Sequence, residues 1–526
     1  MLRIKNSNLG LFVQDTWYVN SNLTLTLGLR GDRPDVSPNP QYNAVASDKF
    51  GYNNSKVFGS DFLIQPRVGF NYTFDSERPT QLRGGVGLFQ GDAPQVWIGN
   101  SFANTGLNYA AYSFTAFRPD LPFSPDKDSQ PVPATPGSAT QAVNFVGDDF
   151  KLPSLWKANL ALDHELPWYG VVASAEVLMT KVKDGLFYKS LNIGPVTQPG
   201  TDPLPASIGP DGRDLYWNPG AVNRAWTTSD NRYNRDQRFG DIYLIDNTDK
   251  GKTQQFTLSL SKPWSEISDW SWDIGYTYTH ATEVGTLTSS TASSGWGYQY
   301  GFNANDESEN TSRYEIKDRI SGSLNWKHKF FGDYETQVGL VYEGRSGRPY
   351  SYIYNGDANG DGRTLNDLFY VPSGPGDVLF GTINANGSFS ANPALEKQFY
   401  DWLAANPQLA KYAGSYAPAN GFRAGWVNTF DVRITQQLPG FMKGHKSEIW
   451  LDIQNVGNLI NKDWGHIMDY GFYADARVAN LQGIYDGKYV YNTLYLDQPT
   501  AANADADGFN TGVSQWSMQL GFRYQF

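Results

Sequence analysis

The sequence predicts an all-β fold, a transmembrane antiparallel β-barrel with short periplasmic turns and long extracellular loops. Three observations support this prediction. Apolar and polar residues alternate with a period of two, the links between the alternating segments are alternately short and long, and aromatic residues make up 15% of a polar chain. Period-two alternation indicates strands with one apolar face, and aromatic residues are enriched in strands.

The alternating segments number about 13, each roughly 10–13 residues long, which is near the length that a tilted strand needs to cross a bilayer. The clearest is LTLTLGLR (23–30), in which leucine fills one face and polar residues or glycine fill the other. The last is WSMQLGFRYQF (516–526), which alternates up to the C-terminal phenylalanine. One segment, 392–412, has helical character and is expected inside a long loop.

The links between these segments alternate strictly in length. The short links are residues 20–21, 75–79, 167–169, 263–269, 331–333 and 439–445, and the long links are roughly residues 31–63, 91–154, 184–252, 283–316, 347–425 and 458–513. In an antiparallel sheet, this alternation places every long link at the same end. A soluble β-sandwich has no reason for that arrangement, whereas an outer-membrane barrel has short periplasmic turns and long extracellular loops.

The two faces of the predicted strands differ as a barrel requires. The apolar face is expected to contact lipid, while the other face carries both charge signs and is expected to line a wet lumen. The predicted lumen residues include Arg67, Asn71, Arg83, Lys157, Asp163, Glu176, Asp273, Lys327, Gln337, Asp431, Arg433, Asp452 and Arg523. Aromatic residues near the short links are expected to form a girdle at the periplasmic interface; they are Trp17, Phe74, Trp168, Tyr169, Trp264, Trp270, Phe330 and Tyr334.

The odd number of strands has a consequence for the ends of the barrel. With Phe526 at the periplasmic side, 13 strands place the N-terminus outside and leave segment 9–19 without a closing partner. An open sheet edge is not stable in lipid, because its unpaired N–H and C=O groups have no water to bind. We therefore expect at least one further strand before this segment. The N-terminus also has no apolar stretch of the kind found in signal peptides.

Composition excludes several classes of function. The net charge of −11 leaves no excess of Lys and Arg to neutralise nucleic acid, and the absence of cysteine excludes disulfides and thiol chemistry. The five histidines show no metal-ligand spacing, and neither a nucleophile elbow nor a phosphate-binding loop is present. We therefore expect the protein not to be an enzyme.

Several blocks resemble the barrels of TonB-dependent outer-membrane receptors, and in particular the Oar-like group with a carboxypeptidase-regulatory-like domain. The blocks are LGLFVQDTWYVNSNLTLTLGLRGD (9–32), GRSGRPYSYIYNGDANGDGRTLNDLFYVP (344–372), DIQNVGNLINKDWG (452–465) and the terminal GFRYQF. This resemblance implies a 22-stranded barrel, an N-terminal plug and a TonB box. Residues 1–526 are then expected to be the C-terminal portion of the barrel, without plug domain or signal peptide.

Residues 357–363, DANGDGR, are the strongest candidate for a metal site. Side-chain oxygens at positions 1, 3 and 5 with glycine at position 6 match the first half of an EF-hand calcium loop. The expected ligands are Asp357, Asn359, Asp361, the backbone carbonyl of Arg363, and Asp367 in place of the missing glutamate at position 12. The alternative is an Asx-rich turn without metal.

A second run, residues 503–508, repeats this pattern with Asn503, Asp505 and Asp507 but has no clear later ligand. A solvated acidic loop is the alternative there. Two further loop segments, 100–117 and 295–305, are rich in aromatic residues, which either bind a sugar or peptide ligand or pack against each other over the barrel mouth.

Together these features predict an integral barrel of a Gram-negative outer membrane that takes up a scarce or large substrate. Its expected partners are outer-membrane lipid and lipopolysaccharide, the barrel-assembly machinery through the C-terminal strand, and the TonB complex only through the absent N-terminal region. Two alternatives remain: a plug-less structural or adhesive barrel, and a soluble secreted β-rich binding protein.

Overall fold

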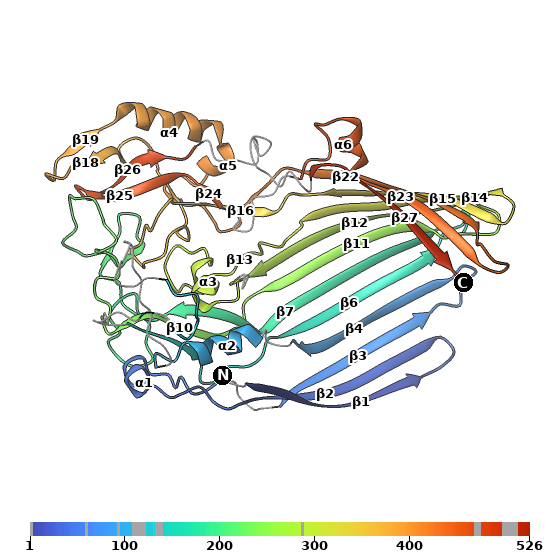
Figure 1. Ribbon diagram of the computed structural model, residues 1–526, viewed down its shortest axis with the longest axis horizontal. Helices are drawn as coiled ribbons and strands as arrows, with labels where there is room; N and C mark the ends of the chain where they lie inside the picture. Colours follow the sequence, from blue (N-terminus) through green and yellow to red (C-terminus); the bar gives the residue numbers. More distant parts are fainter. Residues whose placement is uncertain are drawn as a thin grey trace.

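A curved antiparallel sheet of thirteen long strands dominates the computed structural model, which describes residues 4–57, 62–91, 95–107, 123–129, 131, 140–285, 289–467, 475–496 and 514–526. Each strand pairs with the next along this order (Figure 1): β1 (Lys5–Tyr18), β2 (Leu23–Ser37), β3 (Leu63–Thr73), β4 (Thr80–Gln90), β6 (Ser154–Glu165), β7 (Val172–Ser190), β11 (Lys252–Lys262), β12 (Trp270–Glu283), β14 (Asp318–Phe331), β15 (Tyr334–Arg345), β22 (Val427–Pro439), β23 (Lys446–Gln454) and β27 (Ser517–Gln525). The predicted strand count and meander order are confirmed.

The predicted alternation of short and long links is also confirmed. Tight turns join the strands at one end of the sheet, and six long connections leave the other end (Figure 1). The connections are residues 38–62, 91–153, 191–251, 284–317, 346–426 and 455–516. The described part of the chain begins at the long-connection end and finishes at the turn end, as an odd strand number requires.

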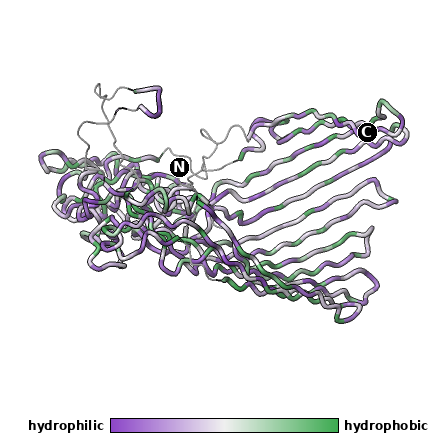
Figure 2. Tube along the Cα trace, turned by 60° about the horizontal axis from the view of Figure 1, so that its bottom comes forward, coloured by the Kyte–Doolittle hydropathy of each residue, from purple (hydrophilic) through white to green (hydrophobic). Residues whose placement is uncertain are grey.

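The pairing of β11 with β12 shows why these sequences form strands with two different faces. Phe256 lies opposite Tyr278 and Leu258 opposite Tyr276, and all four side chains are exposed on the outer face. Between them, Thr257 lies opposite Thr277, with their hydroxyls 3.1 Å apart. Exposed apolar rows of this kind are stable only when lipid covers them. Figure 2 shows this alternation along the strands and the more hydrophilic character of the connections.

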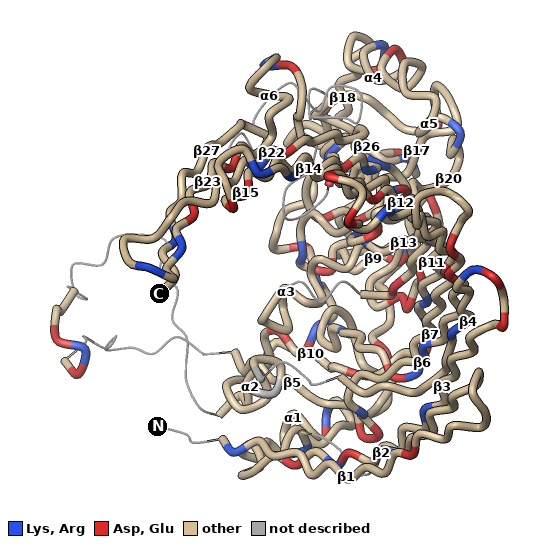
Figure 3. The backbone as a smooth tube through the Cα atoms, turned by 90° about the vertical axis from the view of Figure 1, so that its right-hand side faces the viewer, with Lys and Arg blue, Asp and Glu red and all other residues tan. Residues whose placement is uncertain are grey.

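The sheet is an arc whose outermost strands, β1 and β27, each have one neighbour within the described chain (Figure 3). Trp516, Met518, Leu520, Phe522 and Phe526 are all exposed in or beside β27, as predicted for a lipid-facing strand. In the described parts of the chain, no helix is both long enough and apolar enough to cross a membrane.

The described residues of the six long connections fold together, and we call this unit the loop cap. Three short strands continue the main sheet into it, and the other elements form small sheets and short helices. These elements are β5 (Gln141–Val146), β10 (Phe239–Thr248), β13 (Asn310–Thr311), β8 (Ser207–Ile208), β9 (Asp214–Leu215), β16 (Pro349–Ile353), β17 (Tyr370–Val371), β18 (Leu379–Ile383), β19 (Phe389–Ala391), β20 (Ser415–Tyr416), β21 (Phe422–Arg423), β24 (Asp475–Arg477), β25 (Ala479–Tyr485), β26 (Lys488–Leu494), α1 (Ala44–Phe50), α2 (Gln95–Ala103), α3 (Ala292–Gly297), α4 (Pro393–Ala405), α5 (Pro407–Ala410) and α6 (Val456–Ile460).

Strand pairing between different connections holds the loop cap together. β18 pairs in parallel with β26, and β16 pairs in parallel with β24, so connections 346–426 and 455–516 share two sheets. Their common core contains Tyr354, Phe369, Phe399 and Tyr491, all fully buried. The helix predicted within residues 392–412 is present as α4 and α5 and packs on this core.

Candidate functional site

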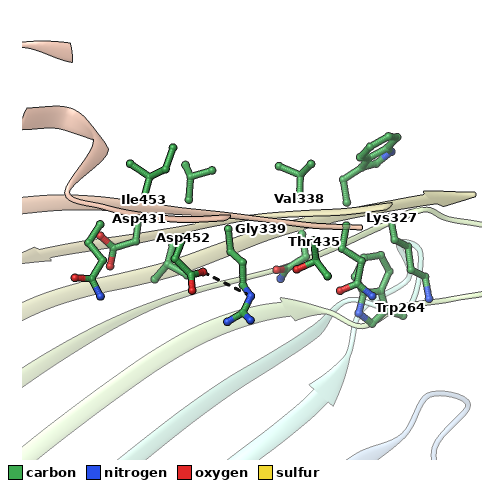
Figure 4. A pocket seen from close by; sticks show the side chains of 15 residues that line it. Trp264, Lys327, Val338, Gly339, Asp431, Thr435, Asp452 and Ile453 are labelled. Carbon is green, nitrogen blue, oxygen red and sulfur yellow. Dashed lines mark ion pairs between the residues drawn. The ribbon is translucent and has the colours of Figure 1, made fainter. Parts of the chain in front are cut away.

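Four strands, β14, β15, β22 and β23, form a groove on the concave face of the sheet, and Trp264 of the turn after β11 also lines it. Its volume is about 590 Å³, and Figure 4 shows Lys327, Asp431, Thr435 and Asp452 on the same side of the strands, opposite Val338 and Ile453. This separation follows from the period-two alternation of each strand. The concave face is therefore the polar lumen face that the sequence predicts.

Contacts between tryptophan rings and cationic side chains give the lumen face in and beside the groove a mixed polar and aromatic surface. The ammonium group of Lys327 lies 4.5 Å from the ring centre of Trp264. On β23, Trp450 lies between two guanidinium groups, 5.1 Å from Arg433 and 5.6 Å from Arg523. The prediction that Trp264 belongs to the lipid-facing girdle is wrong, because Trp264 follows the end of β11 and turns inward over the groove (Figure 4).

Ion pairs between neighbouring strands line the lumen face. Arg83 on β4 pairs with Asp163 on β6 at 3.1 Å, and Arg433 pairs with Asp452 at 3.6 Å. Arg319 pairs with Glu343 at 2.8 Å. Because these groups are partly exposed, the pairs hold the side chains against the wall without removing them from water.

A second, larger concavity of about 870 Å³ lies on the same face over strands β2 to β7. Its lining includes Arg67 and six glycines, which are Gly28, Gly69, Gly85, Gly87, Gly91 and Gly185. Gly69 and Gly85 are direct partners across β3 and β4. Without side chains at these positions, the sheet backbone itself forms the floor of the concavity.

The aromatic segment 295–305 packs inside the loop cap rather than forming an open ligand surface. Trp296 and Tyr300 are 5% and 6% exposed, and the ring of Phe302 stacks on Tyr416 at 4.6 Å. This agrees with the self-packing alternative for segment 295–305. In the other aromatic segment, 100–117, the described residue Phe102 is buried, and positions 108–117 lie outside the described residues.

The predicted calcium loop forms a compact turn in connection 346–426. The Asp357 carboxylate accepts hydrogen bonds from the N–H groups of Gly360 at 2.7 Å and Gly362 at 3.0 Å. Gly360 has a φ of +78°, and a side-chain carbon there would lie 2.7 Å from the backbone nitrogen of Trp217. Glycine is therefore required at Gly360 by both conformation and space.

The structure brings four of the predicted ligand side chains into this turn. Asn359, Asp361 and Asp367 are each 1% exposed, and Asp357 is partly exposed. Burial raises the pKa of Asp361 to about 6 and that of Asp367 to about 7, and it also raises the pKa of Asp357. Repulsion from Asp361 also raises the pKa of Asp357 and of Asp367, so ionising the three carboxyls together is unfavourable.

The other predicted ligands are placed differently. The guanidinium group of Arg363 lies over the ring of Tyr298, 5.1 Å from its centre. Asn503, Asp505 and Asp507 lie outside the described residues. Among the described residues, no three His, Cys, Asp or Glu side chains converge closely enough to hold a metal ion alone. Any cation near this turn would therefore need amide or backbone oxygens as well.

Sequence reasoning missed the most buried charge in the loop cap. Arg213 is fully buried and pairs with Asp211 at 3.0 Å, and its guanidinium donates to the Leu368 carbonyl at 2.7 Å. Asp367 lies 3.5 Å away, and the Tyr489 hydroxyl donates to Asp211 at 2.8 Å. The network thus joins connections 191–251, 346–426 and 455–516.

The block 452–465 has a structural role where β23 meets α6. Asn455 has a φ of +51°, and its amide nitrogen donates to the carbonyls of Gly465 and Ser514. The Asp431 carboxylate accepts from the backbone N–H of Asn455 at 2.7 Å. These bonds fix connection 455–516 to β22 and to the end of β23.

The free energy of unfolding of the loop cap is expected to fall as pH rises from about 4 to about 8. Burial raises the pKa of both Asp246 and Asp475, so the folded cap retains protons that the unfolded chain releases near pH 4. Their contribution to stability is complete below that pH and is lost as pH rises through the raised pKa values. Thermal unfolding followed by near-ultraviolet circular dichroism at pH 5 and pH 8, with chelator, measures this change.

The double variant Asp246→Asn, Asp475→Asn should reduce the pH dependence. Asp230 serves as a control of opposite sign, because its hydrogen bonds with Arg224 lower its pKa to about 2. Asp230→Asn should leave the slope between pH 5 and pH 8 unchanged. Stability that rises with pH in the wild type would contradict the assignment.

Comparisons with known proteins found a matching family model and several similar solved structures. The family model described as "Outer membrane beta barrel domain" matches residues 2–463. Among solved structures, the copper transporter OprC shares 11% identity over 88% of this chain and 44% of its own, with a TM-score of 0.37. The outer membrane transporter YddB from Escherichia coli shares 12% over 86% of this chain and 50% of its own, with a TM-score of 0.38.

A mutant of the ferric enterobactin receptor PfeA from Pseudomonas aeruginosa shares 10% identity over 86% of this chain and 40% of its own, with a TM-score of 0.38. The chain thus spans 40–50% of the length of these three structures. No curated protein sequence matches it.

The exposed apolar outer face, the polar lumen face and the long connections at one end of the sheet define an integral membrane β-barrel of the outer-membrane type. The matched family model covers most of the chain, so the chain belongs to the outer membrane β-barrel domain family.

Proposed function

We propose that this chain forms part of the barrel wall of a TonB-dependent outer-membrane receptor, which takes up a scarce or large substrate. The observation that carries the proposal is the loop cap, in which connections 346–426 and 455–516 pair at the end of a polar, mixed-charge lumen wall. A passive pore needs an open mouth. Interlocked connections above a polar wall suit capture of a solute outside and its passage along the concave face.

The resemblance of residues 9–32, 344–372 and 452–465 supports the finer assignment to the Oar-like group with a 22-stranded barrel. In that assignment, the energy-coupling step belongs to a plug domain and TonB box outside these 526 residues. The lipid-facing rows would contact outer-membrane lipid and lipopolysaccharide, and the aromatic C-terminal strand would be read by the barrel-assembly machinery. We assign binding and translocation to the chain, without catalysis.

Calcium is the proposed cofactor of the long connections. Both acidic runs, 357–363 and 503–508, fall in these connections, where the calcium concentration of many habitats would favour occupancy. The described run, 357–363, is developed in the next subsection.

An epistasis experiment tests the receptor function. A strain lacking this gene and a strain lacking tonB should fail to grow on the same scarce nutrient in a screening panel, and the double mutant should be no worse. The reading frame upstream of Met1 should encode a plug and TonB box. Independent or additive growth defects without an encoded plug would favour the structural or adhesive barrel.

A biochemical experiment separates the membrane barrel from a soluble secreted protein. The chain isolated from outer membranes should need detergent to stay monodisperse, and it should migrate differently on gels before and after heating. A chain that is monodisperse without detergent would contradict both barrel functions.

A further inference from the structure

A small polar cavity lies between two connections of the loop cap, beside the acidic turn. Its volume is about 10 Å³, which is room for the centre of a single water or ion. Asn359, Asn366 and Asp367 line one side, from connection 346–426. Asn303 and Asp306 line the other side, from connection 284–317. The lining therefore presents carboxylate and amide oxygens from two separate stretches of chain.

Asn366 supplies an oxygen that needs a partner. The residue is 6% exposed, and its Oδ1 accepts no hydrogen bond from the part of the chain that the structure describes. Its Nδ2 lies 3.3 Å from a carboxylate oxygen of Asp361, and exchanging the two amide atoms would place oxygen against that carboxylate. The observed orientation is therefore the favourable one, and it leaves a buried acceptor on the cavity. A buried acceptor without a donor is unfavourable, and a bound cation offsets that cost.

The carboxylates of the turn differ in whether they line the cavity. Asp357 and one oxygen of Asp361 accept hydrogen bonds from backbone N–H groups of the turn, the latter from Arg363 at 2.7 Å. Asp367 accepts from the backbone N–H of Ala358 at 2.7 Å and also lines the cavity, and Asp306 lines it from the neighbouring connection. The cation position indicated by the structure is thus displaced from the 1-3-5 centre that the sequence pattern predicts.

We propose that this cavity binds one calcium ion through oxygens of Asn359, Asn366, Asp367 and Asp306. The donor set contains only oxygen, which suits a hard cation, and calcium accepts carboxylate, amide and backbone oxygens in a flexible arrangement. Two carboxylates give a low ligand charge, so the expected Kd is about 10⁻⁴–10⁻³ M, as in extracellular calcium modules.

The bound ion links two connections at a point where their backbones already meet. The Gly301 N–H donates to the Asn366 carbonyl at 3.3 Å, and the Leu368 N–H donates to the Gly301 carbonyl at 3.2 Å. Arg213 approaches Asp367 from a third connection. Bound calcium therefore stabilises the contact between these two connections of the loop cap, a role separate from substrate transport.

Terbium luminescence tests the site in the full chain, because Tb³⁺ replaces calcium and is excited through a neighbouring indole. Trp296 lines the cavity and provides that indole. The background carries Asp505→Asn and Asp507→Asn, which removes the second acidic run. We expect saturable luminescence that calcium displaces with a midpoint of about 10⁻⁴–10⁻³ M. Trp296→Phe should lower the luminescence while calcium affinity, measured by isothermal titration, stays unchanged.

Ligand variants decide where the ion binds. Asp306→Asn and Asn366→Leu should each weaken calcium binding about tenfold or more. Asp401→Asn is the matched control, because Asp401 is exposed on α4 and pairs with Lys397. Heat-dependent gel migration shows that each variant is folded.

Two results would overturn the proposal. Absence of saturable calcium or terbium binding would show that the cavity holds water only. Binding that survives Asp306→Asn and Asn366→Leu without change in affinity would place the ion elsewhere.

Discussion

Replacing Arg213 with methionine is expected to lower the free energy of unfolding of the loop cap by about 3–5 kcal/mol, because it leaves buried carboxylates without a partner. Both side chains of the Arg213–Asp211 pair are 0% exposed, and Asp367 also loses its nearest cation. The Leu368 carbonyl loses its donor as well. Limited proteolysis and thermal unfolding of the chain in detergent measure the loss.

Lys397→Met is the matched control for Arg213→Met. Lys397 forms an exposed ion pair with Asp401 on α4, and exposed pairs contribute about 0–1 kcal/mol. Arg213→Lys keeps the charge but not the planar donor geometry and should fall between the two variants. A loop cap that resists protease equally in Arg213→Met and Lys397→Met would show that the buried network does not hold the connections together.

Placing arginine at Leu258 is expected to destabilise the barrel by about 2–4 kcal/mol in a bilayer, the cost of a charge on the lipid face near mid-depth. Leu258 lies in the middle of β11, is 45% exposed, and has Tyr276 as its cross-strand neighbour on the apolar face. Urea unfolding in phospholipid vesicles, followed by tryptophan fluorescence, measures the change.

The neighbouring position provides an internal control. Thr257→Arg places the same charge one residue away, on the lumen face, where Thr257 contacts Thr277. Water reaches that face, so the expected change is much smaller. Equal destabilisation by the two variants would contradict the assignment of lipid and lumen faces for the whole sheet.

The sequence was sufficient to predict the sheet because its information is local. In LTLTLGLR the leucines mark one face within a few residues, and the short link at 20–21 brings β1 beside β2. Such patterns yielded thirteen strands, their order and the side of the long connections. The same rule failed at Trp264, which lies beyond the end of β11, where alternation no longer determines direction.

The interior of the loop cap could not be predicted in this way. β18 pairs with β26 and β16 with β24, and these partners come from different connections far apart in sequence. No local periodicity specifies which distant segment supplies the neighbouring strand. Arg213 illustrates the same limit, since GPDGRD reads as a solvated turn until Asp367 and Leu368 fold over it.

The lining of the cavity that we propose as a calcium site was predicted in part. The sequence pattern identified Asn359 and Asp367 by spacing along one stretch of chain. It had no means of identifying Asn366, which matches no position of the pattern, or Asp306, which comes from another connection. Sites assembled from several loops need the tertiary structure, because no single stretch of sequence contains all of their ligands.

The parallel pairing of β18 with β26 has a consequence for assembly in the cell. β18 has β19 on one side, and its other edge stays unsatisfied until β26, in the last connection before β27, is in place. Long-range pairings of this kind form late, after the loop-closure entropy has been overcome. β18 therefore gains its second partner only when the connection between β23 and β27 has folded. Partly assembled molecules would expose the unpaired edge of β18 on the outside, where a surface protease or chaperone is able to recognise it.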